Sequence, residues 1–595
     1  MKAENFASQN RKTIMLGIIV IGFSFLLVRL FQMQILQKSF YDQKSQNNSV
    51  KKIEKIPVRG LFLDRNKNVL VNNLPFYSIF ITRADYNTEQ NKLLESVLNL
   101  DEGYIDKFLE DNKKFSKYFQ LRLKRDVPFN VIAWIEENIE HFEGVNYKVE
   151  FQRGYPLDVM GAQMFGYLNE ITQSELNKNK NIYKQGDFIG STGLEKEYET
   201  ILRGEKGFEY ILVDSRQKLI KKLDDNKNTI HAVKGSDLIL SIDAELQKVA
   251  EESLKGKRGA IVAIEPKTGE ILAMVSAPDF DLNKFASVTS DEYFKNLIND
   301  PAKPFFNRAI MSVKPPGSTF KILEAITALE LGVIDKNITY NCTGGGEFYG
   351  RYFKCDAVHG RVNVIQAIEH SCNVFFYNTI YKIGMKKWNE YAEKFGFGKK
   401  TGVDLANEVS GFIPDENYYI KEYGKNWPKS IMASLAIGQG EISVDPIQLA
   451  QFTSIVANNG DTFKPHILKG YIDEKTNKYV SINAKPIHIA IDKDVLDLVK
   501  KGMFLVVNGR GTAYASRLPD IMMAGKTGTA ENPHGADHAL FIGFAPFDDP
   551  QIAFSIIVEN AGFGASHAAP IGKLLVQTYL GKKLNNETNN KLAVK

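Results

Sequence analysis

An uncharged apolar segment near the N-terminus constrains the fold of this chain most strongly. Residues Thr13 to Val28 carry no charge, and the apolar stretch continues past Arg29 to Leu36. A helix needs about 20 such residues to cross a bilayer, and the stem of an arginine can carry its charge to the interface. No cleavage site of small residues follows. We therefore predict an uncleaved transmembrane anchor at residues 13–36, with a buried core helix as the alternative.

Charge and composition restrict the class of protein. Basic residues flank the apolar segment on both sides, so the positive-inside rule does not orient it. A chain of 595 residues is expected to form more than one domain, and 44% hydrophobic with 24% charged residues is usual for globular protein. The net charge is only +5, without a basic stripe of interleaved aromatic residues. This composition argues against nucleic acid as a partner.

The remaining patterns predict an α/β chain. Residues 87–137 have the pattern of amphipathic helices with polar connectors, and 224–235 is typical of a linker. Arg59, Asp64 and Arg65 are better explained as a structural ion-pair network than as a catalytic cluster. After residue 236, strand patterns at the beginning and end bracket a long helical middle. We predict these segments: tail 1–12, anchor 13–36, non-catalytic module 37–236, catalytic domain 237–583 and a disordered tail 584–595.

Three short motifs gain meaning from their order along the catalytic domain. Each pattern also occurs elsewhere: Ser-x-x-Lys begins at Ser49 and Ser215, and Lys-Thr-Gly begins at Lys267 and Lys400, all in loops or polar segments. One set alone combines an apolar helix pattern after its serine with a strand pattern around its Lys-Thr-Gly. That set is Ser318-Thr319-Phe320-Lys321, Ser371-Cys372-Asn373 and Lys526-Thr527-Gly528.

The residue types of this set suit nucleophilic attack on an amide. A serine hydroxyl needs a base to take its proton, and Lys321 lies on the same helical face as Ser318, three residues later. A lysine is a base only when neutral, so its pKa must fall from ~10.4 through burial and a nearby positive charge. Lys526 can supply that charge. A side chain at Gly528 would block a peptide lying along the strand edge.

The three motifs resemble those of the penicillin-binding proteins and serine β-lactamases. Pro57-Val58-Arg59-Gly60 and Gly190-Ser191-Thr192-Gly193-Leu194-Glu195 are similar to the non-catalytic module of the class B penicillin-binding proteins. Asn307-Arg308-Ala309, Gly438-Gln439-Gly440 and Pro446-Ile447-Gln448-Leu449-Ala450 are similar to the elongation type of that class. The resemblance runs from the membrane segment to about residue 580 and so covers nearly the whole chain.

The resemblance implies an architecture and a set of roles. It implies a membrane anchor, a mixed α/β pedestal or dimerisation module, and a transpeptidase domain with an antiparallel sheet and a helical subdomain. Ser318 would be the nucleophile and Lys321 the base, while Ser371 would relay a proton. The backbone N–H groups of Ser318 and Thr529 would form the oxyanion hole. The implied catalytic residues are Ser318, Lys321, Ser371, Asn373 and Lys526, and the implied substrate-binding residues are Thr527, Gly528 and Thr529.

The implied reaction is the cross-linking of peptidoglycan. The D-Ala-D-Ala end of a stem peptide would acylate Ser318, and an amine of a neighbouring stem peptide would take the acyl group. β-Lactams would mimic the donor, and no organic cofactor would be needed. The resemblance places one span in the cytoplasmic (inner) membrane, with the catalytic domain periplasmic. A SEDS-family glycosyltransferase and other elongation-complex proteins are the implied partners.

Three alternatives use the same motifs. They are a division-type class B penicillin-binding protein, a β-lactamase or D,D-carboxypeptidase, and a non-enzymatic β-lactam sensor. The first is the nearest rival, and the form of Gly438-Gln439-Gly440 argues against it. The second would more often lack the anchored pedestal. The intact serine and lysine residues of the three motifs argue against the sensor.

The cysteines are confined to one short window. All three, Cys342, Cys355 and Cys372, lie within it, and His359 lies among them. A disulfide would leave one thiol over, whereas three cysteines and a histidine suit a tetrahedral zinc site. The alternative is a Cys342–Cys355 disulfide with Cys372 buried and His359 on the surface. Some elongation-type penicillin-binding proteins resemble this window, with two aspartates, a histidine and a cysteine as metal ligands.

Overall fold

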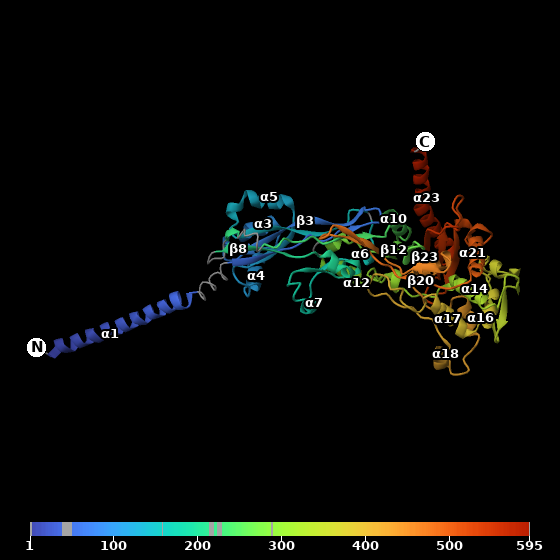
Figure 1. Ribbon diagram of the computed structural model, residues 1–595, viewed down its shortest axis with the longest axis horizontal. Helices are drawn as coiled ribbons and strands as arrows, with labels where there is room; N and C mark the ends of the chain where they lie inside the picture. The colour runs from blue at the N-terminus through green and yellow to red at the C-terminus, as the bar shows by residue number, and fades with distance from the viewer. Residues whose placement is uncertain are drawn as a thin grey trace. The chain divides into compact units, whose positions relative to one another are not determined.

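Figure 1 shows the computed structural model of the chain. It describes residues 3–38, 50–157, 159–213, 219–222, 229–286 and 289–593, so Ser49, Ser215 and part of the predicted linker lie outside the described residues. The chain divides into two compact units. The first comprises Met1–Pro57, Phe76–Glu150 and Glu205–Lys234, and the second comprises Val58–Pro75, Phe151–Gly204 and Gly235–Lys595.

The first unit begins with an apolar helix (Figure 1). Helix α1 spans Ala3–Phe31 and continues as a π-helical turn, Gln32–Leu36. Among the described residues, one helical segment is long and apolar enough to cross a membrane: Asn10–Leu36, with a mean hydropathy of 2.5. No part of that apolar window is buried. By length and composition it fits a single-pass membrane anchor.

The rest of the first unit is a mixed α/β fold. Ile79, Ile81, Leu94 and Phe142 belong to its buried core. Residues 120–127 form a strand, where the sequence pattern had predicted helices with polar connectors throughout 87–137. The helices are α3 (Asn91–Leu98), α4 (Tyr104–Asp111) and α5 (Phe129–Glu137); the strands are β1 (Val50–Lys55), β4 (Gln120–Val127), β8 (Gly207–Val213), β9 (Leu219–Lys222) and the C-terminal half of β3 (Val69–Thr82).

The second unit contains a buried network of ion pairs. Arg153 pairs with Glu195 at 2.6 Å, and Arg59 pairs with Glu195 at 2.6 Å and with Glu199 at 2.5 Å. Burial opposes the charge of Glu195, but the two guanidinium groups outweigh it and lower its pKa. Arg153 also donates to the carbonyl of Gly60 at 2.7 Å. The network therefore joins three stretches of the chain, and it confirms the structural role predicted for Arg59.

A five-stranded antiparallel sheet forms the core of the second unit. Alternate residues of strand β11 belong to two different buried clusters, with Ile261 and Ala263 in one and Ala260 and Val262 in the other. Both faces of this strand are therefore covered. The strand order is β12-β11-β23-β22-β21. The bounds are β11 Gly259–Ile264, β12 Ile271–Ala277, β21 Ala524–Ala530, β22 His538–Ala545 and β23 Ile552–Val558.

A helical subdomain lies between the sheet strands in sequence, which confirms the predicted α/β class. Its helices include α14 (Lys321–Glu330), α15 (Val364–Glu369), α16 (Asn373–Ile383), α17 (Met385–Lys394), α20 (Pro446–Ala457) and α21 (Lys493–Asn508). Every residue of α20 is buried. The final helix, α23, spans Ala569–Ala593, so the chain is helical through most of the segment that we predicted to be disordered.

A first prediction concerns the ion-pair network. Replacing Glu195 by Gln would leave the guanidinium group of Arg153 buried without a carboxylate, while Arg59 keeps Glu199, so we expect a loss of about 3–5 kcal/mol in the free energy of unfolding. Thermal unfolding of the detergent-solubilised chain measures this. Glu390→Gln is the matched control, because the Lys387–Glu390 pair is solvent-exposed, and it should leave the melting temperature unchanged. Equal melting temperatures for the two variants would contradict the structural role of the network.

Candidate active site

The serine of the first motif lies in a tight turn at the start of α14. A 3-10 turn, Gly317–Phe320, runs directly into the helix, as the sequence predicted. Ser318 is half-buried and Lys321, one turn later, is fully buried. Gly317 has a φ of +54°, and a Cβ atom there would lie 2.5 Å from the carbonyl oxygen of Thr529. Only glycine fits this contact, which brings the serine turn against strand β21.

The hydroxyl of Ser371 is shared by two buried lysines. Lys321 Nζ donates to Ser371 Oγ at 3.2 Å, and Lys526 Nζ donates to the same oxygen at 2.9 Å. Lys321 also donates to the Ser371 carbonyl at 2.8 Å and to Asn373 Oδ1 at 2.5 Å. Lys526 has a second acceptor in the Thr527 carbonyl at 3.1 Å. Four of the predicted catalytic residues are therefore in direct contact, and Ser318 lies one helical turn from Lys321.

Burial weakens both amines as bases. Burial lowers the pKa of Lys321 to about 8, against an opposing effect of Asp356. Burial, together with the charge of Lys321, lowers the pKa of Lys526 well below its ordinary value. The direction for Lys321 is the one that the sequence led us to expect of a base, whereas the fixed positive charge expected on Lys526 stays a prediction. Asp356, a residue that sequence reasoning missed, favours the charged form of both amines.

Ser371 has a left-handed backbone conformation, with a φ of +56°. It follows α15 at the position where a Schellman motif ends many helices. Its N–H donates to the Ile368 carbonyl at 3.3 Å, and the N–H of Cys372 donates to the Ala367 carbonyl at 2.9 Å. Glycine is the usual residue at this position because a Cβ atom there is strained. The strained serine turns the chain so that its hydroxyl reaches both amines.

Strand β21 forms one edge of the sheet and carries the predicted substrate-binding residues. Thr527 Oγ1 lies 2.6 Å from Thr512 Oγ1, and Gln439 Nε2 donates to the Thr529 carbonyl at 3.1 Å. A Cβ atom at Gly528 would lie 2.9 Å from Thr319 Cγ2. The close packing of the serine turn is thus a second reason for glycine there, beside the passage of a peptide. Sequence reasoning missed Thr512, because no local motif surrounds it.

A cavity adjoins the serine turn and the end of β21. Its volume is about 470 Å³. Two carboxylates, Glu531 and Asp537, lie in its wall, and Pro315 belongs to the segment immediately before the serine turn. The full lining is Pro315, Gln439, Gly440, Glu531, Asn532, Pro533 and Asp537. The residues of the three motifs do not belong to this lining.

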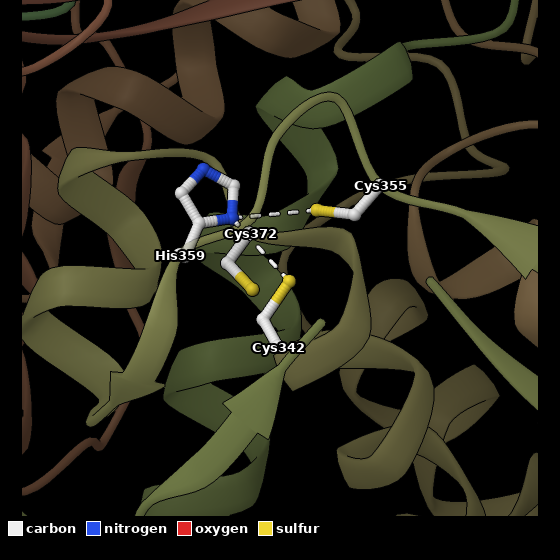
Figure 2. A group of neighbouring side chains, drawn as sticks. All are labelled: Cys342, Cys355, His359 and Cys372. Atoms are coloured by element: carbon white, nitrogen blue, oxygen red, sulfur yellow. Dashed lines mark hydrogen bonds between the residues drawn. The ribbon is translucent and has the colours of Figure 1, made fainter. Parts of the chain in front are cut away.

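The structure brings the predicted metal ligands together (Figure 2). The ligand atoms of Cys342, Cys355, His359 and Cys372 all lie within 4.8 Å of one another. His359 Nδ1 is 3.5 Å from the sulfur atoms of both Cys342 and Cys355. All three thiols are free, so the alternative Cys342–Cys355 disulfide is not formed here.

Two ligand–ligand distances of the cluster, 3.5 Å each, match the edge of a tetrahedral metal site. Bonds of about 2.3 Å to sulfur and about 2.0 Å to nitrogen give a ligand–ligand edge of about 3.5 Å in a tetrahedron. The thiol of Cys355 is prepared for ionisation, because hydrogen bonds from Cys372 and from backbone N–H groups lower its pKa. One of these N–H groups belongs to Asn373, at 3.2 Å from the sulfur. The cluster is therefore joined to a residue that binds Lys321.

Comparisons with known proteins agree with this site. The penicillin binding protein transpeptidase domain matches residues 259–577, and the penicillin-binding protein dimerisation domain matches residues 54–240. The peptidoglycan D,D-transpeptidase MrdA of Acinetobacter baumannii is 33% identical, with 96% of this chain and 87% of that protein covered. The penicillin-binding protein PBP2 of Helicobacter pylori, solved in complex with MreC, superposes with a TM-score of 0.74 at 28% identity, covering 90% of this chain and 99% of that chain. A chain of a peptidoglycan synthase complex superposes with a TM-score of 0.74 at 26% identity, covering 96% and 98% respectively.

A second prediction separates the two properties of Ser371. Ser371→Ala and Ser371→Gly both remove the hydroxyl, so both should slow acylation by a fluorescent penicillin by about 10²–10⁴-fold. Only glycine relieves the left-handed strain, so the Gly variant should be more stable than the Ala variant by about 1 kcal/mol. Labelling kinetics and thermal unfolding measure the two effects. If either variant acylates at the wild-type rate, Ser371 is not the relay; if the Ala variant is the more stable, the strain argument is wrong.

Proposed function

The chain belongs to the class B penicillin-binding proteins, and from this we propose that it cross-links peptidoglycan stem peptides during cell elongation through an acyl-enzyme on Ser318. The observation that carries this function is the Ser371 hydroxyl, held between the amines of Lys321 and Lys526 beside the Ser318 turn. This arrangement supplies a nucleophile, a base and a proton relay. The substrate-binding edge strand β21 runs beside them.

Binding of the donor peptide prepares the base. The terminal carboxylate of D-Ala-D-Ala, held by the hydroxyls of Thr527 and Thr529, places a negative charge near Lys526 and raises its proton affinity. A proton then moves from Lys321 through the Ser371 hydroxyl to Lys526. The hydroxyl oxygen supports this path because it lies 3.2 Å and 2.9 Å from the two nitrogen atoms. Lys321 becomes neutral and can act as a base.

Acylation and transfer use the same groups in opposite directions. Ser318 Oγ attacks the carbonyl carbon of the penultimate D-alanine while Lys321 takes the hydroxyl proton. The N–H groups of Ser318 and Thr529 hold the oxyanion, at about 3 kcal/mol per donor. The amide bond breaks, and D-alanine leaves with a proton delivered from Lys526 through Ser371. An amine of a second stem peptide then attacks the acyl-enzyme and gives its proton through Ser371 to Lys526. The acyl–oxygen bond breaks, and Lys321 returns the proton to Ser318 Oγ.

The helix at residues 10–36 supports a location in the cytoplasmic membrane. We place the catalytic domain on the outer side of that membrane. The related Helicobacter pylori protein was solved with MreC, and another relative belongs to a peptidoglycan synthase complex. We extend these partners to this chain as a class: membrane proteins of the elongation complex, including a SEDS-family glycosyltransferase that supplies uncross-linked strands. β-Lactams would acylate Ser318 as mimics of the donor peptide.

A third prediction tests this function. Ser318→Ala should lose covalent labelling by fluorescent penicillin and the release of D-alanine from a stem peptide, while its melting temperature stays close to that of the wild type. Ser215→Ala, which removes the serine of another Ser-x-x-Lys run, is the matched control and should keep both activities.

In cells depleted of the native protein, Ser318→Ala should leave cells rounded, whereas Ser215→Ala should restore rods. Filamentation on depletion would indicate the division type, and a penicilloyl adduct on another residue would refute the nucleophile.

We also propose that Cys342, Cys355, His359 and Cys372 bind one structural zinc ion. The ion would supply no step of the reaction. The supporting observations are the fit of the ligand distances to a tetrahedron and the position of the cluster. Cys372 lies between Ser371 and Asn373 in sequence, and Cys355 accepts from the Asn373 N–H at 3.2 Å. Ligation would therefore fix the loop that presents Ser371 and Asn373 to the two lysines.

A fourth prediction concerns this zinc site. Protein purified without chelator should contain about one zinc per chain by elemental analysis, and Cys355→Ser and His359→Ala should lose it. Removal of the metal should lower the melting temperature and slow penicillin acylation together, because one loop serves both. His370→Ala is the matched control: its ring stacks on that of His359 with centroids 6.0 Å apart, but it lies outside the ligand set. Metal-free wild-type protein with normal stability would exclude the site.

A further inference from the structure

A second buried acid–base group lies one helical turn beyond the catalytic lysine. Glu324 is fully buried on α14, three residues after Lys321. Residues at this spacing lie on the same helical face, with Cβ atoms about 5–6 Å apart. The neighbouring residues of the helix, Leu323 and Ala325, are also fully buried. The mechanism described above gives this carboxyl group no role.

Both oxygen atoms of Glu324 lack a hydrogen-bond partner within the described part of the chain. Such a group destabilises a fold, because burial removes its water without replacing the hydrogen bonds. An apolar side chain of similar size would avoid this loss. A carboxyl group in this position therefore needs an explanation that its packing does not supply.

The charge of Lys321 supplies that explanation. Burial raises the pKa of Glu324 well above its ordinary range, and the positive charge of Lys321 acts in the opposite direction. In return, Glu324 favours the charged form of Lys321. Three other groups act on the charge of one or both lysines: Asp356, Cys355 and Cys372. The first two follow strand β15 (Arg351–Lys354), and Cys372 directly precedes α16. The charge of Lys321 also acts on Lys526.

We propose that Glu324 is a positioning residue for the reaction: it holds the proton on Lys321 and so sets how readily Ser318 is activated. The inference rests on the function proposed above and concerns the regulation of that site. Glu324 and Lys321 titrate as a coupled pair, so the first proton that the pair loses can come from either group. When it comes from Glu324, the resulting carboxylate favours the charged form of Lys321. Lys321 is therefore neutral less often beside an ionisable carboxyl group than beside an amide. The free enzyme would thus keep its serine less reactive until a donor peptide draws the proton towards Lys526.

The test is the pH dependence of acylation. The second-order rate of labelling by fluorescent penicillin, measured on the full detergent-solubilised chain between pH 5 and 9, rises as the base becomes neutral. In Glu324→Gln, we expect this rise to move to lower pH by about half a unit to one unit, so that the rate within the rise, where the wild-type Glu324 is ionised, increases about three- to tenfold. A purely structural role for Glu324 would not move the pH profile in this direction.

Two further variants keep the proposal falsifiable. Glu324→Met removes the carboxyl and its unmet hydrogen bonds, so it should show the same shift with a higher melting temperature. Thr327→Val is the matched control: Thr327 is fully buried on α14 and uncharged, so its variant should follow the wild-type pH profile. Wild-type profiles for both Glu324 variants would overturn the proposal. Failure of the wild-type chain to label at all would instead overturn the proposed function.

Discussion

The structure of the active site depends on one hydroxyl group that accepts hydrogen bonds from two buried amines. The protein interior solvates the charge of each protonated lysine poorly, and two protonated amines on one oxygen repel each other. One of the two must therefore be the weaker base, and the oxygen between them offers a path for the proton. Lys321 has three acceptors and Lys526 two, and burial lowers the pKa of both.

The fold brings these groups together from distant parts of the sequence. Lys526 lies on an edge strand of the sheet, while Lys321 and Ser371 lie at the ends of helices in the helical subdomain. A close backbone contact holds the two parts in register: a Cβ atom at Gly317 would lie 2.5 Å from the carbonyl oxygen of Thr529 on β21. Replacement of this glycine would force the two backbones apart. The register matters because a shift of about 1 Å at a catalytic group is enough to lower a rate strongly.

The sequence predicted those parts of the site that follow from local geometry. Ser318 and Lys321 share a helical face because they are three residues apart, and the edge strand at Lys526 followed from its apolar neighbours. The left-handed turn at Ser371 was not predictable, since serine has no preference for it; backbone hydrogen bonds after α15 and the contacts of its hydroxyl stabilise it there. Thr512 and Asp356 lack a motif. The relative basicity of the two lysines was not predictable from the sequence, because it depends on hydrogen-bond partners from several elements.

The same distinction applies to the fold. The sheet and helical subdomain were predicted from long apolar runs, whereas strand Gln120–Val127 was missed because charged residues obscure its alternation.

The groups that perform the chemistry are also those that stabilise the fold least: two buried amines, a strained serine and a carboxyl group without partners. Stability must come from elsewhere, chiefly from the sheet with its buried strands and from the Arg153–Glu195 network. That separation leaves the active-site residues free to be selected for proton affinity instead of packing.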